Sequence, residues 1–351
     1  MLSVRKNFPT FVTGASGFIG RKIAERLLAD GRKVRVLSRR PLPELEAMGA
    51  EIVLGDLHDS HALERGCRSA ETVFHAAGRV GVWGPRAEFF RVNVDGTQRL
   101  LTACRNAGVR RFIYTSSPSV VYNGGHLRNV DESALLCLHA PCAYPTSKAA
   151  AEIEVLQAHS ANLATIALRP HLVWGPGDRN VVPRVIALAR AGKLKVVGNG
   201  TNKVDITHIA NVVDAHLLAE GALVANPQPS TLTAQLPLPA VGGKAYFITN
   251  GEPVILWDWI NRVLKGVGLP PVTSNVPLPM AYLAGGLLEA WWRVTGREGE
   301  PPMTRFMAKE MATDHYFNID AARRDLGYHP LVTVEDGTAE LIEHYKKGNA
   351  F

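Results

Sequence analysis

Short apolar runs alternate with helical patterns along the first half of the chain. The runs at Val53 and at residues 73–74, 112–113 and 165–168 are rich in β-branched and aromatic side chains, which favours buried strands. The stretches between them are long enough for helices that cross from one strand to the next. Strands that alternate with helices up to Arg169 predict an α/β fold with a doubly wound parallel sheet.

The alternation weakens in the second half of the chain. Residues 181–195 still read as a helix, whereas residues 224–243 are rich in Pro, Leu, Thr and Ala without a sustained period and predict a flexible insertion. We therefore expect an N-terminal domain at residues 1–175 and a smaller C-terminal lobe at residues 176–351, formed mostly by residues 252–314.

Three glycines stand at the first strand–helix junction. Gly14, Gly17 and Gly20 follow the apolar residues 11–12 and precede a helix whose apolar residues form one stripe. Glycines here let the backbone turn tightly and approach a pyrophosphate, which the free N–H groups of the helix then bind. A glycine run alone often marks only a turn. The strand–turn–helix context favours a dinucleotide cofactor, and with it a Rossmann domain at residues 1–175.

The end of the second strand bears on the type of cofactor. Residues 34–37 lead into Ser38, Arg39 and Arg40, where an NAD-binding chain would show Asp or Glu. A carboxylate would accept from the ribose 2′-hydroxyl and repel a 2′-phosphate, whereas arginines offer charge-assisted donors to that phosphate. A solvated basic loop is the alternative reading. The pattern favours NADP(H) over NAD(H).

Tyr144 and Lys148 are four residues apart, so on a helix they point the same way. Free Tyr titrates near pH ~10. A cation about 4 Å away, at an effective dielectric of ~20, is worth roughly 4 kcal/mol or about 3 pK units. We therefore expect the Tyr144 phenol to have a pKa near 7, where general acid–base catalysis is efficient (roughly neutral operating pH). The pair alone is a weak signal, and the glycine motif strengthens it.

Composition narrows the class of protein. The 351 residues are 46% hydrophobic and 20% charged, enough for one large core with an appended substrate region. No stretch reaches ~18 uncharged apolar residues, and the first strand begins near Phe11, so we expect a cytoplasmic protein without a signal peptide. Four cysteines in a chain of this length favour reduced thiols. The spacing of Cys137, His139 and Cys142 matches no common zinc pattern, so no metal site is expected.

The net charge of +7 is compatible with nucleic acid, an anionic membrane or an acidic ligand. The lysines and arginines are spread over the chain, and no compact basic run contains interleaved aromatic residues. Nucleic acid is therefore not expected as a partner. NADP(H) and an acidic substrate would both benefit from a positive field.

Taken together, these motifs resemble the extended short-chain dehydrogenase/reductases nearly from end to end. The other matching segments are residues 55–57, 75–78, 93–97, 114–117, 168–170 and 174–176. The resemblance implies a third catalytic group at Ser117, with Ser116 as the weaker choice, beside Tyr144 and Lys148. It also implies that residues 203–223 return to the nucleotide-binding sheet and that the protein is a homodimer. The cofactor contacts that motif and resemblance imply are Gly14, Ser16, Gly17, Phe18, Ile19, Gly20, Ser38, Arg39, Arg40, Asp56, Leu57, Ala76, Ala77, Gly78, Thr115, Tyr144, Lys148, Pro170 and Val173.

Three features concern the substrate. Sugar-nucleotide epimerases of this family carry an Asn where this chain has Leu172. The loop at residues 80–84 is apolar, and residues 276–288 carry no charge. The latter segment is too short to span a bilayer as a helix. It reads either as an ordinary buried helix or as an apolar lid over a long hydrocarbon ligand, with a membrane as a further contact.

These traits resemble the 3β-hydroxysteroid dehydrogenase branch, and within it the bacterial reductases of 2-alkyl-3-oxoalkanoates in olefin biosynthesis. The implied reaction is reduction of a C3 ketone by NADPH, in which Tyr144 donates the proton, Lys148 lowers its pKa and binds ribose, and Ser117 donates to the carbonyl. The implied partner is a lipophilic acid, whose carboxylate Arg179, Arg184 or His171 could hold. The expected substrate contacts are Val80, Trp83, Ser117, His171 and Arg179.

Two alternatives remain open at this point. One is NAD(P)-linked oxidation of a 3β-hydroxysteroid or a sterol-4α-carboxylate. The other is a redox-inactive NADP(H)-binding regulator on the same fold, against which the complete set of Ser117, Tyr144 and Lys148 argues.

Overall fold

A seven-stranded parallel sheet forms the centre of the computed structural model, which describes residues 8–140, 142–225 and 240–348. Its strands are β1 (Thr10–Thr13), β2 (Val34–Ser38), β3 (Glu51–Leu54), β4 (Thr72–His75), β5 (Arg111–Thr115), β7 (Ala164–Pro170) and β12 (Lys244–Ile248). They lie in the order β12-β7-β5-β4-β1-β2-β3. The strand order reverses between β1 and β4, as expected of a doubly wound sheet. The predicted fold class is confirmed.

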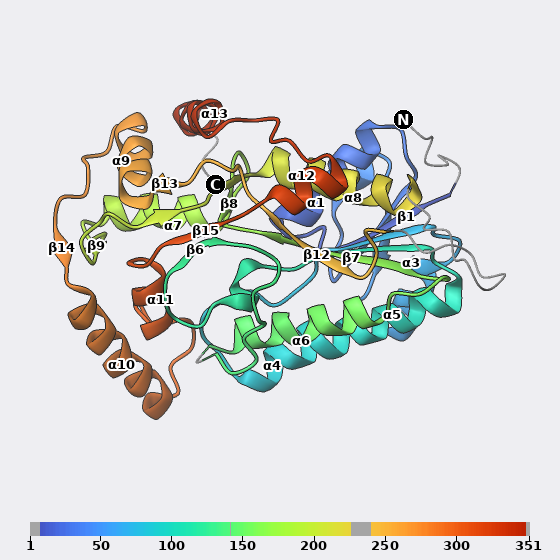
Figure 1. The fold of residues 1–351 in the computed structure, drawn as a ribbon, viewed down its shortest axis with the longest axis horizontal. Coiled ribbons are helices and arrows are strands. Elements are labelled where there is room, and N and C mark those ends of the chain that lie inside the picture. Colours follow the sequence, from blue (N-terminus) through green and yellow to red (C-terminus); the bar gives the residue numbers. More distant parts are fainter. Residues whose placement is uncertain (1–7, 141, 226–239, 349–351) are drawn as a thin grey trace.

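Helices cover both faces of this sheet (Figure 1). One face packs against α1 (Phe18–Ala29), α8 (Ile209–Ala225) and α12 (Asp320–Leu326), and the other against α3 (Ser60–Cys67), α5 (Gly96–Ala107) and α6 (Ala143–Gln157). Shorter helical segments lie in the connections between strands and helices: α2 (Pro43–Ala47), α4 (Arg86–Phe90), the π-helical η1 (Arg91–Asp95) and the 3-10 helix η2 (Pro118–Val121).

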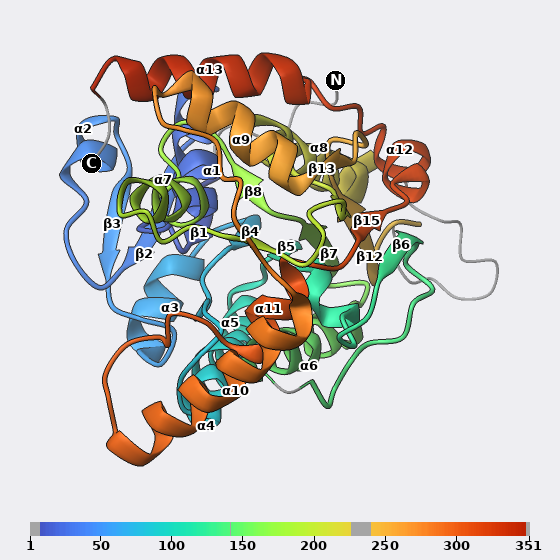
Figure 2. The same ribbon diagram turned by 90° about the vertical axis from the view of Figure 1, so that its left-hand side faces the viewer.

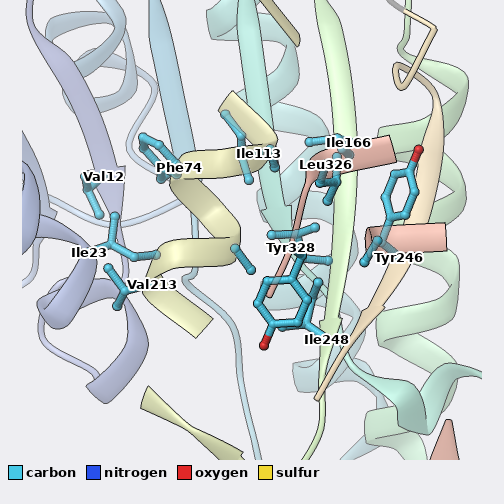
Figure 3. Close-up of a cluster of buried hydrophobic side chains, with 14 of the residues drawn as sticks. Val12, Ile23, Phe74, Ile113, Ile166, Val213, Tyr246, Ile248, Leu326 and Tyr328 are labelled. Carbon is cyan, nitrogen blue, oxygen red and sulfur yellow. The ribbon is translucent and has the colours of Figure 1, made fainter. Parts of the chain in front are cut away.

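Neighbouring residues of one strand enter different hydrophobic clusters. Val12 and Phe74 pack toward α1 and α8, as Figure 3 shows, while Phe11 and Val73 pack toward α3 and α5. Because successive side chains of a strand point to opposite faces, a sheet covered on both sides needs apolar residues at nearly every position. This requirement explains the continuous apolar runs that identified the strands.

The remaining elements form a smaller lobe beside the carboxyl ends of the parallel strands. A mixed sheet of order β13-β10-β15-β6 joins β6 (Leu127–Val130), β10 (Lys203–Val204), β13 (Val254–Ile255) and β15 (His315–Phe317). Two short parallel pairs add β8 (Val173–Trp174) with β11 (Thr207–His208), and β9 (Val196–Val197) with β14 (Asn275–Val276). The helices of the lobe are α7 (Val181–Arg190), α9 (Leu256–Gly266), α10 (Leu278–Thr295), α11 (Arg305–Glu310) and α13 (Val334–Lys346).

Helix α10 projects at one corner of the molecule, beside α11 (Figures 1 and 2). The two helices touch at Gly285, where an added Cβ would stand 2.7 Å from the Thr304 carbonyl carbon. Glycine is therefore needed for this close approach. Within the described residues, no helix combines the length and the apolar character needed to cross a bilayer, and this holds for α10 as well.

Several segments differ from the sequence reading. The helix expected at residues 181–195 ends at Arg190, because Gly192 turns the chain with a φ of +64°. Helix α8 packs on α1 and the central sheet, and β12 joins that sheet from beyond residue 175. The division at residue 175 stays a proposal. Most of the insertion expected at residues 224–243 lies outside the described residues.

Candidate active site

Glycines at the end of β1 leave room that any side chain would fill. Gly14 has a φ of +78°, and an added Cβ would lie 2.6 Å from the carbonyl carbon of Ala76 and from the amide nitrogen of Ala77. A Cβ on Gly20 would collide with the Gly14 carbonyl. The turn therefore holds β1, the start of α1 and the end of β4 in close contact.

Helix α1 begins in this turn with Gly17 as its N-cap. No side chain caps the helix, and its first turn contains no acidic residue. Its first N–H groups therefore remain open to an anion, and the helix dipole favours one. The cradle of glycines and this open helix end fit the pyrophosphate of a dinucleotide.

The ends of the neighbouring strands extend the cradle. Arg39 and Arg40 are exposed after buried Ser38, and neither has a carboxylate within 4.0 Å among the residues that the structure describes. Asp56 is exposed after β3, while Leu57 is buried against Gly96. These side chains lie at one edge of the sheet, where a dinucleotide binds in such folds.

A buried histidine ties this edge together. His75 Nδ1 lies 2.7 Å from Thr13 Oγ1, and its Nε2 lies 2.9 Å from Thr97 Oγ1. Burial, with the nearby Lys148 charge, lowers the pKa of His75 to about 3. The neutral imidazole therefore joins β1, β4 and α5 without adding a charge beside the cofactor cradle.

Tyr144 and Lys148 stand on the first turns of α6, next to the same edge. The Lys148 ammonium donates to the Thr115 carbonyl at 2.7 Å and lies 4.1 Å from the centre of the Tyr114 ring. It is also close to Gly78, whose added Cβ would be 4.0 Å from it. Lys148 thus lies between the end of β5 and the loop after β4.

The pKa expected for Tyr144 was wrong in direction. Burial raises the pKa of Tyr144 to about 12, although a hydrogen bond from Ser117 opposes the rise. Burial lowers the pKa of Lys148 to about 7, against the charge of Glu152, which raises it. The helical spacing places the pair correctly, but the Lys148 ammonium pairs with the Thr115 carbonyl, and removal from water outweighs any help it gives the phenolate.

The two serines after β5 have different surroundings. Ser117 begins η2, and its Oγ accepts from the Ser119 amide at 3.2 Å and from the Ser119 hydroxyl at 3.0 Å. Ser116 is buried and donates to Glu152 at 2.5 Å. Glu152 also accepts from the buried Arg169 guanidinium. Ser116 therefore belongs to a buried ion pair, while Ser117 faces Tyr144.

Sequence reasoning assigned no role to the link that holds α6 against the loop after β4. Asn93, in the π-helical η1, donates to Ser147 Oγ at 2.9 Å and to the Arg79 carbonyl at 3.1 Å. Its Oδ1 accepts from the Arg79 amide at 2.7 Å. Asn93 lies in one of the matched motifs, but only the fold shows what it positions.

A cavity of about 610 Å³ opens at the start of α6, where Ala143, the residue before Tyr144, lines it. The loop after β4, the residues after η2, the start of α6, and helices α10 and α11 surround it. Its lining residues are Val82, Trp83, Gly84, Pro85, Arg86, Phe89, Tyr122, Asn123, Gly124, Ala140, Cys142, Ala143, Tyr282, Glu289, Trp292, Arg293, Gly296, Arg297, Thr304, Arg305, Phe306 and Lys309.

Of the expected substrate contacts, Trp83 lines this cavity and Ser117 lies beside Tyr144. Val80 is 75% exposed, and Arg179 is exposed outside the cavity. The His171 ring packs against His315 and Phe317, at 5.9 Å and 5.3 Å between ring centres. Burial, with His315, lowers the pKa of His171 to about 3, so this neutral ring offers no charge to a carboxylate.

Residues 276–288 were expected to form either a buried helix or an apolar lid. The helix that contains most of them, α10, turns aromatic side chains toward the cavity and two leucines away from it. Tyr282 and Trp292 of α10 line the cavity, while Leu283 and Leu287 are 66% and 65% exposed on its outer side. Aromatic and basic residues of α11 complete the wall. No periodic pattern in the sequence pointed to these residues of α11.

Residues 11–280 match the profile of the 3-beta hydroxysteroid dehydrogenase/isomerase family. The chain belongs to this family. The resemblance to the extended short-chain dehydrogenase/reductases is confirmed, and with it the assignment as an oxidoreductase.

The similar proteins carry several different names. A 2-alkyl-3-oxoalkanoate reductase from Shewanella oneidensis is 41% identical over 338 residues, which cover 94% of this chain and 84% of that protein. A sterol-4-alpha-carboxylate 3-dehydrogenase, decarboxylating, from Mus musculus is 33% identical over 339 residues and covers 95% and 90% of the two chains. The structure of MoeE5 in complex with UDP-glucose and NAD has a TM-score of 0.72 at 27% identity and covers 97% and 99%.

Proposed function

We propose that this protein reduces the 3-keto group of long-chain 2-alkyl-3-oxo acids to the 3-hydroxy acid, with NADPH as reductant. The observation that carries the proposal is the cavity at the start of α6, lined by the residue before Tyr144, whose walls combine aromatic side chains with basic ones. An apolar chain with an anionic end matches such a lining. The 41% identity to a 2-alkyl-3-oxoalkanoate reductase supports the same substrate class.

The cofactor would lie across the ends of β1, β2 and β4. Gly14, Gly17 and Gly20 would admit its pyrophosphate, and Arg39 and Arg40 would bind a 2′-phosphate. When bound, the reduced nicotinamide supplies the hydride. Lys148 would hold the nicotinamide ribose, and Pro170 and Val173 would lie near the nicotinamide ring.

Tyr144 is proposed as the proton donor to the oxygen of the reacting ketone. A phenol with a pKa of about 12 is protonated at neutral pH, which is the form that reduction requires. Ser117 would donate to the same oxygen. Lys148, with a pKa of about 7, can return a proton to the site after turnover. The raised pKa of Tyr144 therefore suits reduction better than oxidation.

A chain-length series tests this function. An apolar wall gains roughly 0.8 kcal/mol for each methylene that it buries, about fourfold per carbon. We expect kcat/KM for 2-alkyl-3-oxo acids to rise steeply with alkyl length until the cavity is full, and UDP-sugars to show no turnover. A flat series, or a sugar nucleotide that reacts best, would overturn the proposal.

A second candidate is NAD(P)-dependent oxidation of a sterol-4α-carboxylate or 3β-hydroxysteroid. The 33% identity over 95% of the chain to the mouse enzyme favours it. A sterol carboxylate assayed beside the same series separates the two candidate functions, because the true substrate class should have the much higher kcat/KM. If NADPH binds and no substrate is turned over, the redox-inactive regulator becomes the better assignment.

We also propose that the outer face of α10 rests on an anionic membrane. Met280, Leu283, Leu287, Trp291 and Val294 recur every three or four residues and are at least 56% exposed. The acidic residue of this helix, Glu289, is buried against Arg305, whereas exposed basic side chains flank the cavity mouth. An apolar stripe with a basic rim suits an interfacial helix. Homodimerisation and a cytoplasmic location remain proposals that come from the family resemblance.

A further inference from the structure

Five basic side chains line the cavity, and most of them have a partner. Arg305 is bound by Glu289 through its Nε and Nη2 at 2.9 Å and 2.8 Å. Arg293 lies 3.9 Å from the same carboxylate and 5.1 Å from the centre of the Trp83 ring. Arg86 and Arg297 are exposed at the mouth, over the rings of Phe90 and Trp292.

Lys309 differs from the other four. It is half-buried on α11, and none of the described carboxylates lies within 4.0 Å of its ammonium. Its side chain crosses the cavity wall to Gly124, where an added Cβ would lie 3.0 Å from Nζ. Gly124 has a φ of +91° and so favours glycine for a second reason. The glycine leaves space for the ammonium, whose nearest aromatic ring is Tyr282 at 5.5 Å.

The position of Lys309 also fits the substrate. In a 3-oxo acid a single carbon separates the ketone from the carboxylate, so the carboxylate must be held close to Tyr144. Ala143, directly before Tyr144, lines the same cavity as Lys309. Glu310, the next residue of α11, is near enough to raise the pKa of Tyr144. The end of helix α11 therefore lies near Tyr144.

We infer that the Lys309 ammonium binds the carboxylate of the 2-alkyl-3-oxo acid and selects acids over neutral ketones. The inference rests on the proposed function. Lys309 takes the role considered for Arg179, Arg184 and His171. Arg179 lies outside the cavity, Arg184 pairs with Glu300 at 3.2 Å, and the half-buried His171 ring packs against His315 outside the cavity lining.

The neighbouring Glu310 carboxyl sets the electrostatic background of this site. Burial raises the pKa of Glu310 to about 7, so the group is about half protonated at neutral pH. Five basic residues line the cavity, and among the described carboxylates Glu289, which is already paired with Arg305, is the one that lines it. A half-buried ammonium also attracts a carboxylate more strongly than an exposed one would.

The test compares Lys309→Met with Lys309→Arg. Methionine keeps the unbranched stem beside Gly124 but removes the charge, and arginine keeps the charge. Lys265→Met, on the exposed face of α9, is the matched control for loss of one positive charge. Each protein is assayed with a 2-alkyl-3-oxo acid and with its methyl ester, which has the same chain and ketone without the negative charge.

We expect Lys309→Met to lower kcat/KM for the acid about 10- to 100-fold, mainly through a higher KM. The value of kcat/KM for the ester should change less than about threefold. Lys309→Arg should retain most of the preference for the acid. Equal losses on acid and ester, or no loss on the acid, would overturn the inference.

A binding measurement keeps this result separate from the proposed function. Titration calorimetry of the NADP⁺-loaded protein with a 2-alkylalkanoic acid and its amide needs no turnover. The carboxylate site is supported if Lys309→Met binds the acid more weakly than wild type does, while Lys265→Met does not. This result holds even if the wild-type protein reduces neither 3-oxo compound. If wild type binds acid and amide equally, Lys309 does not serve as this site.

Discussion

Tyr144 and Lys148 share one face of α6, yet burial shifts their pKa values in opposite directions, to about 12 and about 7. Each shift favours the neutral form of its group, since both side chains are removed from water. The neutral phenol of Tyr144 is ready to give a proton to a substrate, and Lys148, with its lowered pKa, exchanges protons readily near neutral pH. The proton-donor role proposed for Tyr144 can be tested at one atom, its phenolic oxygen.

Tyr144→Phe removes the phenolic proton and leaves the ring in place. We expect kcat to fall at least about 10²–10⁴-fold, as is typical when a general acid is lost, with little change in NADPH affinity. The measurement is steady-state kinetics together with fluorescence titration of NADPH. Retention of most of kcat would mean that another group donates the proton.

Arg39→Asp tests the cofactor at the exposed residues after β2. The reversed charge should weaken NADPH far more than NADH, because NADPH alone presents the 2′-phosphate. Dissociation constants for both cofactors are compared in the variant and in wild type. A preference of wild type for NADH, or equal losses for the two cofactors, would contradict the NADP(H) assignment.

Some residues were predictable because their signal is local. Gly20 is required by contacts within its own turn and Gly14 by its positive φ, and the i, i+4 spacing alone brings Tyr144 beside Lys148. Lys309 gave no such signal, since its environment comes from Gly124 and Tyr282, far away in the chain. The pKa of Tyr144 was misjudged for the same reason: burial depends on the whole fold.

At the scale of elements, α10 carries two different faces. Tyr282, Glu289 and Trp292 turn toward the cavity, and the exposed stripe turns away from it. The uncharged segment was recognisable in the sequence, but the side that each leucine would face depends on where α11 packs. Glycine at position 285 determines that packing.

Leu283→Asp combined with Leu287→Asp tests the outer face. Two charges in the apolar stripe should reduce binding to phosphatidylcholine vesicles containing phosphatidylglycerol by at least about 10-fold, because each buried leucine is worth roughly 1.5–3 kcal/mol. Co-sedimentation with vesicles is the measurement. Activity on a short, soluble substrate should stay unchanged, because neither leucine lines the cavity.

The control for this prediction is Leu331→Asp, which changes another exposed leucine away from α10. Equal vesicle binding by the double variant and wild type would exclude α10 as a membrane contact. A loss of binding in Leu331→Asp as well would point to a general effect of charge.

At the scale of the molecule, the parallel sheet was predictable and the lobe was not. Strands such as β1 and β4 are apolar on both sides because helices cover both faces. The lobe instead depends on two- to four-residue strands from distant parts of the chain, such as β10 and β15. Pairs this short carry no periodic signal, and their partners are set by three-dimensional contacts alone.

The pairing of β6 with β15 has a consequence for the order of events during synthesis. His315 aligns with Leu127, and Arg128 forms an ion pair with Asp314, 186 positions later. At about 5–20 residues per second, a ribosome needs roughly 10–40 s to make the intervening chain. The cofactor cradle can thus be complete while β6 still lacks its partner and the cavity lacks the wall that carries Lys309. A nascent chain at this stage is able to bind a nucleotide before its proposed substrate cavity is enclosed.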